Sequence, residues 1–111
     1  MFGFLKKLLG LPDGMSPQDA QAMVKTGSAL ILDVRTSAER QAAHIPGSLH
    51  LSLDELGRNA GKLPKDKTII CQCASGMRSA AAAKQLAAQG FTTLNLKGGL
   101  GGWQRAGLPT K

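Results

Sequence analysis

Two short apolar runs constrain the fold more than any other feature of the sequence. The first, ALILDV, covers residues 29–34, and the second, KTIICQ, covers residues 67–72. Each run is continuous instead of alternating with polar residues, which is typical of a strand that is buried on both faces. Strands of this kind occur in parallel sheets that have helices on both sides.

Helical segments separate these runs. Ser16 and Pro17 predict a helix start, because serine is a favoured N-cap and proline suits the first turn, and Gly27 predicts the end of that helix after Lys25. Ser52 and Glu55 form the pattern of a capping box before another helix. We further expect helices at residues 36–42, 56–59 and 79–89, and strands at residues 48–51 and 92–96.

The alternating order of strands and helices predicts an α/β fold with a central parallel sheet and helices on both faces. The sequence has no internal repeat and no low-complexity linker. We therefore expect one domain over residues 16–111, preceded by an N-terminal extension at residues 1–15.

The segment CQCASGMRS, residues 71–79, contains both cysteines of the chain and follows the second apolar run. It lies beyond the carboxyl end of a predicted parallel strand, where ligands collect in such sheets. Between Cys73 and a helix that starts near Ser79 lie Ala74, Ser75, Gly76, Met77 and Arg78. A short loop of mostly small residues can point several backbone N–H groups at the Cys73 sulfur, and the helix adds its positive end. We expect the thiol to be stabilised as a thiolate, its nucleophilic form.

The spacing between cysteine and arginine distinguishes two kinds of chemistry. Four residues separate Cys73 from Arg78, whereas cysteine phosphatases and the related arsenate reductases have five residues in between. Six residues separate Cys71 from Arg78, so neither cysteine fits the phosphatase spacing. The shorter ring suits one added sulfur atom on Cys73 better than a tetrahedral phosphate, and this favours persulfide chemistry.

Charge and cysteine content argue against several other functions. The 14 basic and 7 acidic residues give a formal net charge of +7, which favours anionic ligands. Because the basic residues are scattered and tyrosine is absent, we do not expect a nucleic-acid surface. The two cysteines are too close for a stapling disulfide and lack a second Cys or His pair for a metal, so we expect reduced thiols, no metal and a cytoplasmic location.

The first eleven residues, MFGFLKKLLGL, place apolar side chains on one side at helical spacing, beside two lysines. One interpretation is a short amphipathic helix that contacts a membrane surface or a partner. The other is a terminal helix that packs on the domain or frays. We favour the second, because the segment is short and contains two glycines.

Three stretches resemble the rhodanese family of thiosulfate sulfurtransferase-type domains: LILDVRTSAERQAAHIPGSLHLSLDEL, IICQCASGMRSAAAAKQLAAQGF and LNLKGGLGGWQRAGLPT. The resemblance covers residues 16–110. It implies a catalytic cysteine at Cys73, a loop from Cys73 to Arg78 that holds a persulfide, and a two-step ping-pong transfer without metal or organic cofactor. The implied ligands are small sulfur-containing anions and thiol acceptors, and an acidic sulfur-acceptor protein fits the basic charge.

Several charged residues are expected to support this loop. Arg78 ends it, and we expect a carboxylate to anchor the arginine, with Asp33 and Glu39 as candidates because both follow the end of a strand. Asp33 and Arg35, in the stretch DVR, are expected to shape the mouth of the pocket and to take no part in the chemistry.

Three other side chains have structural interpretations that we favour. His44 is expected to form structural hydrogen bonds, because an ionised cysteine needs no general base. Trp103 is expected to lie in the core. Met77 is expected at the mouth of the site, either in contact with an acceptor or as an exposed loop residue.

Cys71 has two interpretations. We favour a small buried hydrophobic residue in a central strand, because free cysteine is among the most buried residue types. Alternatively, Cys71 resolves the persulfide on Cys73 and forms a disulfide with it. Residues two apart in a strand point to the same side, although a bridge between them would be strained.

Two positions depart from the family pattern. Ala74 stands where many members have a basic residue, and Ala43 stands where glycine usually precedes the histidine. The missing charge predicts modest turnover of dianionic thiosulfate. Three functions are considered: a sulfurtransferase or sulfur carrier, a non-enzymatic interaction module, and a phosphatase or arsenate reductase. Cys73 and its complete loop favour the first.

Overall fold

The two apolar runs form neighbouring strands at the centre of a parallel sheet. The computed structural model describes residues 14–111, and in it β2 (Ala29–Asp33) pairs with β4 (Thr68–Gln72) along the length of both strands. Next to β4 lies β5 (Thr93–Leu96), followed by β1 (Gly14–Met15), and next to β2 lies β3 (Leu49–His50). All neighbouring strands are parallel, which confirms the predicted α/β fold.

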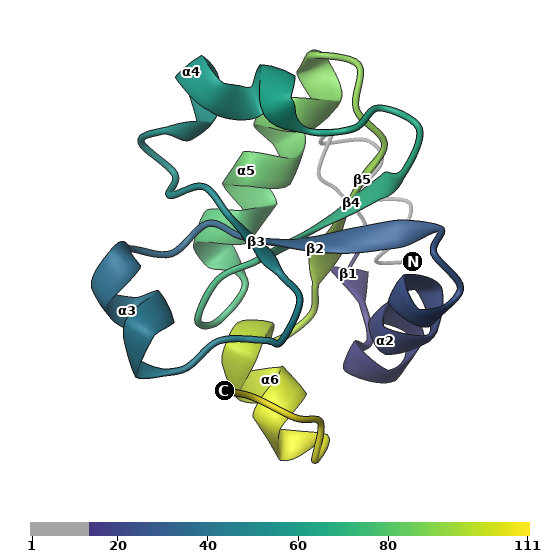
Figure 1. The fold of residues 1–111 in the computed structure, drawn as a ribbon, viewed down its shortest axis with the longest axis vertical. Helices are drawn as coiled ribbons and strands as arrows, with labels where there is room; N and C mark the ends of the chain where they lie inside the picture. The colour runs from purple at the N-terminus through teal and green to yellow at the C-terminus, as the bar shows by residue number, and fades with distance from the viewer. Residues whose placement is uncertain (1–13) are drawn as a thin grey trace, which may run out of the picture.

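Helices cover both faces of the sheet, and each face has its own apolar core (Figure 1). On one face pack α2 (Pro17–Lys25) and α6 (Gly99–Arg105), and on the other pack α4 (Leu56–Asn59) and α5 (Met77–Ala88). Consecutive residues of β4 alternate between the two cores, because side chains of a strand point to opposite sides. This arrangement explains why the apolar runs are continuous.

Two further short elements complete the fold. The short helix α3 (Ser37–Ala42) follows β2 and contains no buried residue. Its first turn has a capping box, in which Thr36 Oγ1 accepts a hydrogen bond from Glu39 N and Glu39 Oε1 accepts one from Thr36 N. The 3-10 helix η1 (Ala60–Lys62) follows α4.

The predicted boundaries hold for α2 and α4, whereas the start of α5 and the cap of α4 differ from the prediction. Ser16 caps α2 as expected, with its hydroxyl accepting a hydrogen bond from Asp19 N at 3.1 Å. Helix α5 begins at Met77 instead of near Ser79, because Gly76 has a φ of 112° and allows the chain to enter the helix two residues earlier. Ser52 and Glu55 hydrogen bond to one another, but they close the turn that precedes α4.

The expected amphipathic segment at residues 1–11 lies outside the described residues. The described chain starts with β1, an edge strand that pairs with β5 through Met15 and Leu96. Within residues 14–111, none of the helices has the length and apolar character needed to cross a bilayer.

Helix α6 is not among the predicted elements, because glycines at four of the positions 98–102 lower helix propensity. The structure shows what these glycines permit. Leu100 N donates a hydrogen bond to Cys73 O at 2.8 Å, and Gly101 N donates one to Ala74 O at 3.2 Å. Gly99 has a φ of 60°, and a Cβ at this residue would lie 2.5 Å from Cys73 O. The start of α6 therefore contacts the backbone that follows β4 so closely that only glycine fits.

We predict that Gly99→Ala destabilises the protein by about 2–4 kcal/mol, because it adds a steric clash to the strain of a left-handed backbone. It should also shift alkylation of Cys73 to higher pH, because the displaced loop would lose its alignment with the sulfur. Urea unfolding measures the first effect, and iodoacetamide labelling followed by mass spectrometry measures the second.

Gly27→Ala is the matched control for this prediction. Gly27 has a φ of 81°, but no atom lies within 4 Å of the position that a Cβ would take. The control should cost only about 1 kcal/mol and leave Cys73 reactivity unchanged. Equal effects of the two substitutions would show that contact with the loop is unimportant.

Candidate active site

Cys73 is the first residue after β4, and its side chain is buried at the carboxyl edge of the sheet. Its sulfur receives a hydrogen bond from Gly76 N at 3.1 Å and lies 3.3 Å from Ser79 Oγ, which donates to it. The first contact belongs to the loop that the sequence predicts, and the second comes from α5. Hydrogen-bond donors therefore reach the sulfur from two consecutive elements.

The surroundings of Cys73 favour its ionised form. Burial alone opposes ionisation, but the Ser79 hydroxyl and the backbone N–H groups of Ser79, Gly76 and Ser75 outweigh it, so the pKa of Cys73 is lowered. Cys71 lies in the same apolar core without such donors, and burial, together with the charge of Cys73, raises its pKa to about 12. The two thiols of the chain therefore differ in reactivity, as a nucleophile and an inert core group would.

The backbone carbonyl groups of the loop that starts at Cys73 accept hydrogen bonds from residues outside the loop. Cys73 O accepts hydrogen bonds from Leu100 N and from Gln72 Nε2, the latter at 2.9 Å. Gly76 O accepts one from Asn95 Nδ2 at 3.0 Å. Ala74 O accepts a hydrogen bond from Gly101 N, so the N–H of Ser75 at the other end of that peptide group points away from α6, and it is among the groups that lower the pKa of Cys73.

Arg78 is anchored by Glu39, one of the two predicted candidates. Arg78 Nη1 and Nη2 donate to Glu39 Oε1 and Oε2 at 2.7 and 2.8 Å, which is a two-pronged ion pair. The hydrogen bond from Arg78 is the main reason why the pKa of Glu39 falls from 4.5 to about 2, and Glu39 in turn raises the pKa of Arg78. The pair connects α3 to the first turn of α5.

Asp33 and Arg35 do not shape the pocket mouth, and that expectation is wrong. Both are buried, and Arg35 Nε and Nη2 donate to the two carboxylate oxygens of Asp33 at 3.0 and 2.9 Å. Arg35 also donates to Ala43 O at 2.6 Å, and Arg40 Nη1 lies 3.3 Å from Asp33 Oδ2. A charge at the end of a buried strand needs partners, so these residues bind one another and brace the segment around α3.

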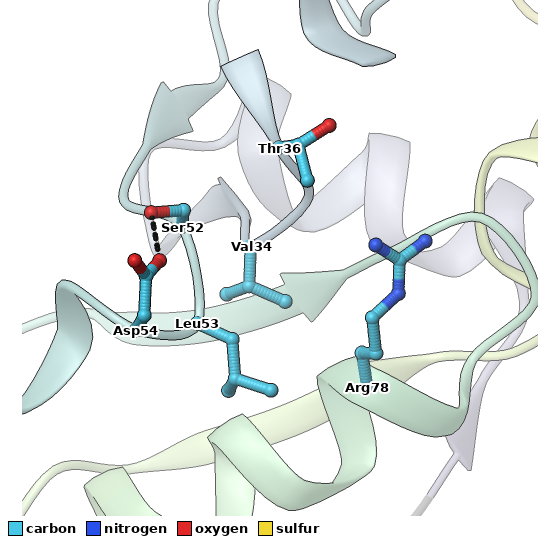
Figure 2. A pocket seen from close by; sticks show the side chains of 6 residues that line it. All are labelled: Val34, Thr36, Ser52, Leu53, Asp54 and Arg78. Atoms are coloured by element: carbon cyan, nitrogen blue, oxygen red, sulfur yellow. Dashed lines mark hydrogen bonds between the residues drawn. The ribbon is translucent and has the colours of Figure 1, made fainter. Parts of the chain in front are cut away.

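A pocket of about 410 Å³ lies beside Arg78. It is lined by two apolar and four polar residues: Val34, Leu53, Thr36, Ser52, Asp54 and Arg78. Figure 2 shows Arg78 on one side and the hydrogen-bonded pair of Ser52 and Asp54 on the other, with Val34 and Leu53 between them. The pocket lies next to Arg78, which closes the loop, and its lining suits a small molecule with an apolar body.

The remaining candidates have the structural positions that the sequence suggests. His44 Nδ1 lies 3.2 Å from Arg40 O, and the backbone of His44 exchanges hydrogen bonds with Lys111. Trp103 is buried in the core between α6 and the sheet, and its Nε1 donates to Pro109 O. Met77 is 82% exposed at the start of α5.

Sequence reasoning missed one residue that contacts the sulfur and one that contacts the loop around it. Ser79 is fully buried and contacts Cys73, and Asn95 on β5 contacts both Ser79 and the loop. The position of Ser79 in the first turn of a helix whose start faces the thiol is a signal in the sequence. Asn95 has no such signal, because it comes from a distant strand. Over residues 14–111, no group of three or more His, Cys, Asp or Glu side chains is placed to hold a metal ion.

Comparison with known proteins identifies relatives over most of the chain. A sulfurtransferase from Allochromatium vinosum is 37% identical over 91 residues, which cover 81% of this chain and 85% of that protein. The thiosulfate sulfurtransferase GlpE of Actinobacillus succinogenes is 34% identical over 96 residues, which cover 86% of each chain.

Solved structures give the same result. A rhodanese-related protein from Thermoplasma volcanium has a TM-score of 0.83 and 29% identity, with 89% of this chain and 97% of that chain covered. The family model of the rhodanese-like domain matches residues 16–106, almost all of the described chain. With its sheet, its loop after β4 and these relatives, the chain belongs to the rhodanese-like domain family.

Proposed function

We propose that this chain transfers sulfane sulfur through a persulfide on Cys73. The relatives named sulfurtransferase support sulfur transfer as the general activity. The observation that carries the more specific proposal is the pair of hydrogen bonds that the Cys73 sulfur receives from Gly76 N and Ser79 Oγ. Donors aimed at a sulfur favour its thiolate form, which is the nucleophile that this chemistry needs.

In the first half-reaction the Cys73 thiolate attacks the outer sulfur of thiosulfate or of a persulfide donor. The S–S bond of the donor breaks, and its electron pair leaves with sulfite or with the donor thiolate. The transferred sulfur then bears the negative charge at the end of a Cys73 persulfide. Backbone N–H groups of the loop from Ala74 to Arg78 are proposed to hold that charge.

In the second half-reaction an acceptor thiolate, or cyanide in an assay, attacks the terminal sulfur. The S–S bond of the persulfide breaks, its electron pair returns to the Cys73 sulfur, and the acceptor leaves with the added sulfur. Charge and atoms balance without a metal or an organic cofactor. We propose small sulfur-containing anions as donors and thiols, including the thiol of an acidic protein, as acceptors in the cytoplasm.

The pocket beside Arg78 is proposed to hold the part of the acceptor that does not react. Its apolar lining by Val34 and Leu53 suits a carbon body, whereas the carboxylate of Asp54 would repel a dianion. This argues for a thiol in the pocket and agrees with modest use of thiosulfate.

A phosphatase function is disfavoured for two reasons. The loop from Cys73 to Arg78 is one residue shorter than the phosphatase spacing. In addition, both terminal nitrogens of Arg78 already bind Glu39, so the guanidinium is not free to clamp a phosphate. An interaction module without chemistry has no need for a cysteine with a lowered pKa.

The two cysteines give the most direct test. We predict that Cys73→Ser abolishes transfer from thiosulfate to cyanide, whereas Cys71→Ser retains most of it, because only Cys73 has hydrogen-bond donors at its sulfur. Mass spectrometry after thiosulfate treatment should show one added sulfur atom on Cys73. Loss of transfer in Cys71→Ser with activity kept in Cys73→Ser would overturn the assignment.

The anchor of the loop predicts a dependence of stability on pH. Because Arg78 lowers the pKa of Glu39 from 4.5 to about 2, the ionised pair stabilises the fold above pH 4.5, and this stabilisation is lost as the pH falls toward 2. Glu39→Gln should lower the free energy of unfolding at neutral pH by about 0.5–1 kcal/mol, since the pair is partly exposed, with no difference left near pH 2.

Urea unfolding at a series of pH values measures this difference. Asp66→Asn is a suitable control, because it removes the same charge from an exposed residue that forms no ion pair among residues 14–111. A difference between wild type and Glu39→Gln that persists unchanged at low pH would mean that the ion pair is not its source.

The positive charge of the chain predicts an effect of salt. We expect the rate with thiosulfate to fall about threefold or more between low ionic strength and about 0.2 M, because salt screens the attraction of a dianion to a chain of charge +7. A neutral organic trisulfide, which carries an uncharged group at each end, is the control donor and should show little change. Steady-state rates over a sodium chloride series decide, and a rate with thiosulfate that ignores salt contradicts this electrostatic account.

A further inference from the structure

The hydroxyl of Ser79 has two acceptors and one hydrogen. Ser79 Oγ lies 2.6 Å from Asn95 Oδ1 and 3.3 Å from Cys73 Sγ, and the residue is fully buried. A hydroxyl carries a single donor, so it can serve only one of these two acceptors at a time. Whether the hydroxyl donates to Asn95 Oδ1 or to Cys73 Sγ therefore depends on the charge of the sulfur.

The orientation of Asn95 is determined by its other contact. Asn95 Nδ2 donates to Gly76 O at 3.0 Å, so the opposite atom of the amide, Oδ1, faces Ser79. A carbonyl oxygen is only an acceptor. Asn95 Oδ1 can thus accept the hydrogen bond of the hydroxyl whenever the sulfur carries no negative charge.

The charge on the Cys73 sulfur changes during the proposed cycle. In the free thiolate the charge lies on Sγ, and the Ser79 hydroxyl donates to it. In the persulfide the charge has moved to the terminal sulfur, Sγ is a weak acceptor, and the hydroxyl returns to Asn95 Oδ1. Charge comes back to Sγ only when the acceptor takes the terminal sulfur.

We propose that Ser79 is a catalytic residue of the second half-reaction, in which its hydroxyl rotates from Asn95 to Cys73 Sγ and stabilises the departing thiolate. The proposal rests on the proposed function. The acceptor forms its bond to the terminal sulfur while the electron pair of the breaking S–S bond returns to Sγ. The hydrogen stays on the oxygen throughout and only its hydrogen bond moves.

This role affects the two half-reactions differently. In the first, the hydrogen bond to Sγ must be given up as charge leaves the nucleophile, so Ser79 does not accelerate attack by a thiolate that is already formed. In the second, the hydrogen bond forms as charge arrives, and it lowers the barrier. A residue that only supports the loop would affect both halves alike.

The charged and titratable groups near the sulfur are few among the described residues. Arg78 of α5 and Cys71 of β4 interact with Cys73, and Glu39 of α3 reaches it only through Arg78. Cys71 keeps its proton up to high pH, and Arg78 stays charged. Ionisation around this sulfur at a pH below the range of Cys71 can therefore be attributed to Cys73.

The experiment measures each half-reaction in Ser79→Ala. Rapid mixing with thiosulfate follows sulfite release, and rapid mixing of the isolated persulfide form with cyanide or a small thiol follows sulfur transfer. Both are run about one pH unit above the alkylation midpoint of the variant, where Cys73 is mostly ionised. We expect the first rate to stay within about twofold of wild type and the second to fall about tenfold, in line with the loss of one hydrogen bond to a charged group.

Iodoacetamide labelling supplies a readout that does not depend on sulfur transfer. The pH midpoint for alkylation of Cys73 should rise by about one unit in Ser79→Ala, which corresponds to the same tenfold effect. Ser79→Thr retains the hydroxyl and should restore both the midpoint and the second rate to within about threefold of wild type.

Thr93→Val is the matched structural control. Thr93 Oγ1 donates to Ala83 O and so also connects β5 to α5, but it is not among the groups that contact the sulfur. This variant should leave both half-reactions and the alkylation midpoint unchanged.

Two results would overturn the proposal: equal slowing of both half-reactions by Ser79→Ala, or a second half-reaction as fast as in wild type. Failure of the proposed function looks different, because the wild type would then form no persulfide with thiosulfate or with a persulfide donor. In that case the shift of the alkylation midpoint still reports whether Ser79 stabilises the Cys73 thiolate, and an unchanged midpoint counts against the role of Ser79.

Discussion

The hydrogen bonds that hold the loop carbonyls from outside are the constraint on which the site depends. A peptide group that directs its oxygen toward α6 must direct its N–H the other way. Ala74 O accepts a hydrogen bond from Gly101 N, and the N–H of Ser75 in that same peptide group is among those that lower the pKa of Cys73. Donors of this kind favour a thiolate without a basic residue directly after Cys73, where the sequence has Ala74. Gly99 at the start of α6 belongs to the same arrangement, because its contact with Cys73 O leaves no room for a side chain.

Charged residues around the loop form two separate networks. Asp33 is fully buried and is satisfied by Arg35 and Arg40, so it stabilises the segment that leads into α3. Glu39, at the end of that segment, is partly exposed and binds Arg78. The buried network positions α3, and α3 positions the carboxylate that closes the loop. In this way a strand end with no direct contact to the sulfur still contributes to its surroundings.

The sheet and the position of the loop with its cysteine could be predicted because each depends on local sequence. Continuous apolar runs indicate strands with two covered faces, and a cysteine followed by small residues and an arginine indicates a cradle. The choice between Asp33 and Glu39 could not be made, because Asp33 ends β2, Glu39 follows it by six residues, and only packing decides which of them meets Arg78. Helix α6 was not predicted, because glycine lowers helix propensity. Gly99 is needed there for its close contact with the backbone of Cys73 and Ala74. Asn95 lies 16 residues from Ser79 and 19 from Gly76, so no local sequence pattern predicts its contacts with them.

In the proposed cycle, the burial of Cys71 also closes one route by which a sulfur bound to Cys73 could be lost. A thiol with a pKa of about 12 is almost never ionised at neutral pH, and only a thiolate attacks a disulfide or persulfide at a useful rate. The neighbouring thiol therefore does not discharge the persulfide from within, and hydrosulfide is not lost to solvent by that route. In the proposed cycle the protein behaves as a storage form whose lifetime is set by the arrival of an external nucleophile.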